Sequence, residues 1–106
     1  MKRTMMMLGF ACALLFAATA AFAHTPVCSC FDNGDGTVTC EGGFSDGSSA
    51  SGVRMMVKDG SGKVLIEGKM SGNSDFEFKK PAGDYMVVFD AGEGHVIEIK
   101  GADIVQ

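Results

Sequence analysis

The sequence predicts an all-β protein, a small antiparallel β-sandwich of about seven strands that follows a cleaved signal peptide. Three observations predict this fold. After the first 23 residues, no stretch of 10 or more residues shows helical periodicity. Short runs rich in β-branched and aromatic residues instead alternate with Gly, Asp, Ser and Asn turns, at spacings of about 8–12 residues. Glycine makes up 15 of the 106 residues, about twice its usual share.

Residues 1–23 have the plan of a secretory signal peptide. A positive start at Lys2 and Arg3 precedes an apolar stretch, and Ala21-Phe22-Ala23 then forms an A-x-A cleavage site. Cleavage leaves one domain, residues 24–106, that begins with His24. Of the 9 basic residues 7 remain against 13 acidic ones, so the net charge of this domain is −6. We expect a periplasmic protein that does not span the membrane after cleavage, in a compartment where disulfides form.

Seven runs of this domain are the expected strands. In chain order they are Val27–Phe31, Thr37–Phe44, Val53–Lys58, Lys63–Gly68, Asp75–Lys79, Asp84–Asp90 and His95–Lys100. Turn residues separate them at 32–36, 45–52, 59–62, 71–73, 81–83 and 91–94. Alternation is clearest for Tyr85, Val87 and Phe89, which share one face of their strand, and for Phe76 and Phe78. This pattern is typical of immunoglobulin-like and transthyretin-like sandwiches.

Three cysteines follow the signal peptide, namely Cys28, Cys30 and Cys40. Cys28 and Cys30 are two residues apart, so they face the same side of a strand. A five-residue hairpin loop pairs Phe31 with Thr37 and puts Cys28 opposite Cys40, whereas a shifted loop brings Cys30 within reach of Cys40. Either disulfide staples the fold and leaves one thiol. In the other interpretation Cys28 and Cys30, with Cys40 as a third, are soft ligands for Cu(I), Zn(II) or Ni(II).

The domain contains two histidines, His24 and His95. A terminal histidine chelates a metal through its α-amino group and its imidazole together. If the first and last strands run parallel and side by side, His95 lies at the same end and adds a third nitrogen. The amino-terminal copper/nickel motif is excluded, because Pro26 at position three has no amide proton. The alternative for each histidine is an exposed polar residue beside a turn.

Four segments carry a resemblance to a known family: Phe44–Gly47, Val57–Lys69, Phe76–Phe78 and Asp90–His95 with Glu98. Over about residues 37–100 they resemble the small periplasmic domain of nickel/cobalt uptake systems of the energy-coupling-factor type. That domain belongs to the carboxypeptidase-regulatory-like, transthyretin-like β-sandwiches. Because members begin with a histidine after their signal, the resemblance implies that His24 and His95 are site residues. Members usually continue into a C-terminal transmembrane helix, which this sequence lacks, and the three cysteines are not part of their pattern.

Two interpretations of function follow. The first is a periplasmic metal-binding protein that assists uptake, delivery or buffering of nickel, cobalt or copper, with His24, His95, Cys28 and Cys30 as candidate ligands. Its partners are the metal ion and membrane transporter subunits. The second is a non-catalytic interaction or accessory module stapled by a disulfide. An enzyme is not expected, because no nucleophile–base pair is readable, and a sequence pI of about 4.9 argues against nucleic-acid binding.

Overall fold

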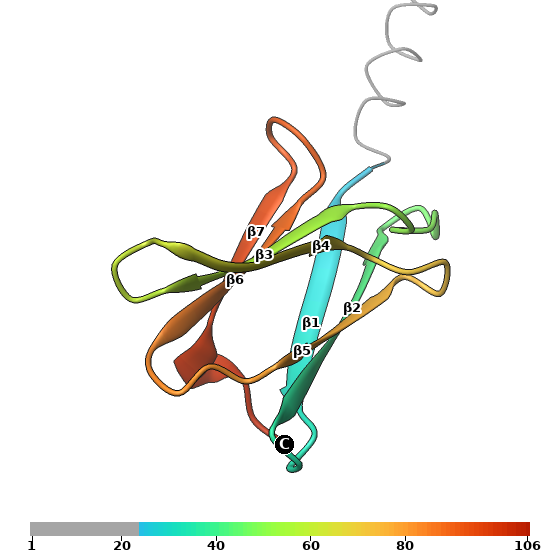
Figure 1. Ribbon diagram of the computed structural model, residues 1–106. Coiled ribbons are helices and arrows are strands. Elements are labelled where there is room, and N and C mark those ends of the chain that lie inside the picture. The colour runs from blue at the N-terminus through green and yellow to red at the C-terminus, as the bar shows by residue number, and fades with distance from the viewer. Residues whose placement is uncertain (1–23) are drawn as a thin grey trace, which may run out of the picture.

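The computed structural model describes residues 24–106, and the predicted signal peptide at 1–23 lies outside the described residues. Residues 24–106 form seven strands and one short 3-10 helix, η1 (Figure 1). Their bounds are β1 (Pro26–Asp32), β2 (Thr37–Phe44), β3 (Arg54–Asp59), β4 (Val64–Lys69), β5 (Asp75–Lys79), β6 (Tyr85–Asp90), β7 (Val96–Lys100) and η1 (Gly101–Asp103). The all-β prediction is confirmed, and each strand begins and ends within one residue of its expected bounds.

The strands form two antiparallel sheets, with the orders β1-β2-β5 and β4-β3-β6-β7. The edge strands β1 and β7 belong to different sheets but contact each other. They run in the same direction (Figure 1), and the amide of Asp32, the last residue of β1, donates to the carbonyl of Val105, which follows η1, at 3.0 Å. The starts of β1 and β7 therefore lie at one end of the sandwich, as the candidate metal site requires.

One apolar layer between the sheets forms the core. Both sheets contribute aromatic and aliphatic side chains, among them Phe89 from the four-stranded sheet and Phe78 from the three-stranded sheet. The largest fully buried residues are Phe89, Met55, Val38, Val57, Val87 and Cys40. Tyr85, Val87 and Phe89 all point inward, which confirms the period-two reading of β6. Residues 24–106 contain no helix that is long and apolar enough to cross a membrane.

Gly42 on β2 lets the two sheets approach closely. A Cβ atom at this position would lie 2.7 Å from Met70 Sδ and 2.8 Å from the Phe89 ring. The next residue, Gly43, faces the other side of the sheet, where the nearest neighbour of a Cβ atom would be the Ser48 carbonyl oxygen at 3.8 Å. Gly42 is thus required by packing, and Gly43 is not.

We predict that Gly42→Ala lowers the free energy of unfolding by about 1–3 kcal/mol, because an extra carbon overpacks a filled core. Gly43→Ala is the matched control, and its effect should stay within about 0.5 kcal/mol. Urea unfolding of both variants measures the difference. Equal midpoints for the two variants would contradict the close packing at Gly42.

Candidate functional site

The end of the sandwich where β1 begins holds His24 in a defined place. The residue after it, Thr25, makes two hydrogen bonds to the loop between β2 and β3. The Thr25 amide donates to Ser45 Oγ at 3.1 Å, and the Ser45 amide donates to the Thr25 carbonyl at 2.8 Å. The backbone therefore fixes the position of His24 without help from the imidazole.

The imidazole of His24 meets a carboxylate from the same loop. His24 Nδ1 lies 2.7 Å from Asp46 Oδ2. The other carboxylate oxygen of Asp46 accepts hydrogen bonds from the Ser48 hydroxyl at 2.6 Å and the Ser48 amide at 2.9 Å. The hydrogen bond from the Ser48 hydroxyl, followed in size by the bond from the Ser48 amide, holds the pKa of Asp46 below its ordinary value. The Asp46 carboxyl group is therefore anionic at neutral pH. The site thus consists of the negatively charged Asp46 carboxylate and the His24 imidazole, whose side chain is 63% exposed.

His95 opens onto the same end of the molecule but bonds within its own turn. Its Nδ1 lies 3.1 Å from the Glu93 carbonyl oxygen, and its amide donates to the Gly92 carbonyl at 2.9 Å. Within residues 24–106, no group of three or more His, Cys, Asp or Glu side chains is placed to hold a metal ion. The structure thus brings His24 to Asp46, and it does not gather His24, His95 and the cysteines into one cluster.

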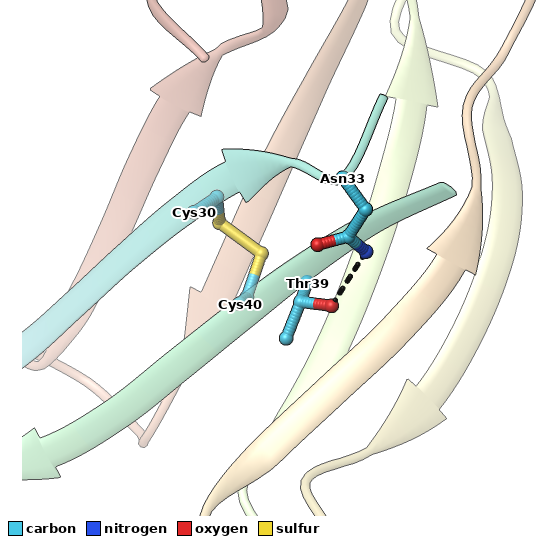
Figure 2. Close-up of a disulfide and its surroundings, with 4 residues drawn as sticks. All are labelled: Cys30, Asn33, Thr39 and Cys40. Carbon is cyan, nitrogen blue, oxygen red and sulfur yellow. Dashed lines mark hydrogen bonds between the residues drawn. A yellow bond between two sulfur atoms is a disulfide. The ribbon is translucent and has the colours of Figure 1, made fainter. Parts of the chain in front are cut away.

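The disulfide joins Cys30 to Cys40, the second of the two pairings that the sequence left open (Figure 2). The two residues are direct partners in the β1–β2 ladder, with Cα atoms 4.0 Å apart. The alternative bond between Cys28 and Cys40 is not formed, and Cys28 lies opposite Gly42. Cys30 and Cys40 are consequently no longer thiolates that could bind a metal.

Of the two loop geometries that the sequence left open, the five-residue loop is not formed, because the ladder continues further toward the turn. Phe31 pairs with Thr39 instead of Thr37, and the Asn33 amide still donates to the Thr37 carbonyl at 3.0 Å. The side-chain amide of Asn33 also donates to Thr39 Oγ1 at 2.8 Å (Figure 2). The tight turn that remains uses positive φ angles at Gly34 (80°) and Gly36 (92°), which favour glycine.

Cys28 is the free thiol of the described domain. It shares the inward face of β1 with Cys30, as the spacing predicts, and it packs against the core cluster. Burial raises the pKa of Cys28 to about 11. At neutral pH the side chain is therefore a neutral thiol, which is a poor nucleophile and a poor metal ligand.

We predict that iodoacetamide labels Cys28 slowly in the native protein at pH 8 and faster as the pH rises toward 11. In denaturant the thiol regains a pKa of about 8.5, so labelling becomes fast. Mass spectrometry of alkylated samples follows both rates. The control variant Cys28→Ala should take up no label, since Cys30 and Cys40 are oxidised. Rapid native labelling at neutral pH would contradict the buried placement of Cys28.

A hollow of about 520 Å³ lies at the far end of the sandwich from His24. It is bordered by the β3–β4 turn, the start of β6 and η1, and it has a largely apolar lining. Lys58 and Lys100, which pair with Met86 from the two neighbouring strands, are among its lining residues. No motif in the sequence pointed to this hollow, and its lining contains no histidine, cysteine or serine.

Asp46 is the site residue that sequence reasoning missed. Its Asp-Gly-Ser tripeptide recurs at residues 59–61, so the motif by itself indicates only a turn. The contact with His24 depends on how the β2–β3 loop folds back over the start of β1. Comparison of the chain with known protein families, with curated proteins and with solved structures finds no match. Function is therefore inferred from the residues and their placement.

Proposed function

We propose that the protein is a periplasmic metal-binding protein that assists the uptake, delivery or buffering of a transition metal. The proposed metals are nickel and cobalt, with copper as the third candidate. One observation carries the proposal: His24, the predicted first residue after cleavage, is held at the end of the sandwich with Nδ1 against the Asp46 carboxylate at 2.7 Å. The resemblance of residues 90–98 to nickel/cobalt uptake domains points in the same direction.

The chemistry of a terminal histidine supports this function. Its α-amine and Nδ1 can bind one ion together and close a six-membered chelate ring. Amine and imidazole nitrogens suit borderline divalent ions such as Ni(II), Co(II) and Cu(II). The net charge of −6 expected for residues 24–106 attracts cations to the domain. His95, at the start of β7, is the second residue that the resemblance implies.

Delivery requires a partner that takes the ion from the domain. The proposed partners are membrane transporter subunits, because the uptake systems that the sequence resembles are membrane transporters. The protein itself is proposed to bind and hand over the metal and to catalyse no reaction. His24 suits this task because its side chain is 63% exposed, so an ion can both enter and leave.

The second candidate function is a non-catalytic interaction module. The observation that favours it is the outer face of β1, where Val27 and Phe31 are 53% and 36% exposed. Apolar side chains on an edge strand can contact another protein. In this interpretation the disulfide only stabilises a small fold, and His24 is a surface residue.

We predict that a chain beginning at His24 binds one Ni(II) or Co(II) ion in isothermal titration calorimetry. Placing one alanine before His24 converts the α-amine to an amide. Loss of a ligand should weaken binding more than the roughly 10–100-fold seen for outer-shell changes. His24→Ala should act in the same way. Binding that survives both changes and disappears only in Cys28→Ala would contradict the histidine site, and no binding by the unmodified chain would favour the interaction module.

A further inference from the structure

We infer that Asp46 is the third ligand of a metal site formed by the α-amine and Nδ1 of His24. This inference rests on the proposed function and names its ligand set. Two nitrogens and one carboxylate oxygen suit divalent Ni, Co or Cu, whereas Cu(I) prefers sulfur. No disulfide, thiol or second histidine takes part.

The His24 nitrogen that contacts Asp46 is the same nitrogen that a chelate with the α-amine requires. Nδ1 is the imidazole nitrogen that closes a six-membered ring with the α-amine, and it is Nδ1 that lies 2.7 Å from Asp46 Oδ2. For an ion such as Zn²⁺, nitrogen and oxygen ligands lie about 2.1 Å from the metal, so two neighbouring ligands at right angles are about 3 Å apart. An ion can therefore bind between these two atoms with only a small movement of the side chains.

The carboxylate is already oriented for this role. Its Oδ1 atom is occupied by the amide and hydroxyl of Ser48, which leaves Oδ2 for His24. Two hydrogen bonds between Thr25 and Ser45 fix the backbone of Thr25, the residue that follows His24. Both partners of the pair stay accessible, because the Asp46 side chain is 26% exposed and the His24 side chain 63%.

The remaining candidate ligands are turned elsewhere. His95 Nδ1 lies against the Glu93 carbonyl. Cys30 is part of the disulfide, and Cys28 faces the core. The side chain that does meet the chelating nitrogen of His24 is Asp46, whose Oδ2 lies 2.7 Å from Nδ1.

The chain contains a matched control for Asp46. Asp59 begins the other Asp-Gly-Ser turn, and its Oδ1 likewise accepts from the Ser61 amide at 2.9 Å and the Ser61 hydroxyl at 2.7 Å. Neither histidine lies at Asp59, since His24 contacts Asp46 and His95 contacts its own turn. Changing either aspartate removes one negative charge and alters the same kind of turn.

The test is calorimetric titration of the chain beginning at His24 with NiCl₂, using Asp46→Asn and Asp59→Asn. We expect Asp46→Asn to weaken nickel binding by at least about tenfold and Asp59→Asn to leave it within about twofold, as for a group outside the site. Urea unfolding shows that both variants are folded. Electron paramagnetic resonance of bound Cu(II) should change in Asp46→Asn alone.

The outcomes separate this inference from the proposed function. If the unmodified chain binds nickel and Asp46→Asn binds it equally well, Asp46 is not a ligand and the proposed function survives. Equal weakening in both variants also overturns the inference, because the loss then comes from charge or turn geometry. If the unmodified chain binds no metal, the proposed function itself fails.

Discussion

The Cys30–Cys40 disulfide fixes the register of β1, and the position of the candidate site depends on that register. β1 is an edge strand paired only with β2, and its side chains alternate between half-buried and exposed. Sliding β1 by two residues would keep the same side chains on the inward face, so hydrophobic burial alone does not choose between the registers. The disulfide does, and it thereby places the start of β1 where Thr25 meets Ser45 and His24 meets Asp46.

The rest of the sandwich provides a rigid base for that end. The inward residues of β2 are small, namely Val38, Cys40 and Gly42. They leave room between the layers for Phe89 from β6 and for Met70, which follows β4. At the far end, Ile104 is buried and the C-terminal residues bond to the end of β1. With both layers closed in this way, polar groups are presented to solvent mainly by the loops at the two ends of the sandwich, and the segments at the starts of β1 and β7 form one of these ends.

Period-two alternation and glycine-rich turns predicted the seven strands, because these signals are local and each strand buries one face. From the sequence, the parallel arrangement of β1 and β7 was only a condition, because strand direction between two sheets depends on the tertiary topology. The cysteine pairing stayed open, since Cys28 and Cys30 share a face and only the turn length decides which of them meets Cys40. The role of Asp46 could not be predicted from the sequence. Its contact with His24 is made by a loop whose path depends on tertiary packing. The same Asp-Gly-Ser turn at Asp59 lies beside no histidine, so the tripeptide alone does not indicate a site.

The most direct test of the account is native mass spectrometry of protein recovered after export through its own signal sequence, in medium that contains nickel. We predict a chain that begins at His24, is lighter than the reduced form by two hydrogens because of one disulfide, and retains one metal ion. A chain that begins at any other residue lacks the α-amine of His24. That result, or a chain from His24 that retains no metal, would contradict the central claim that His24 begins a metal site.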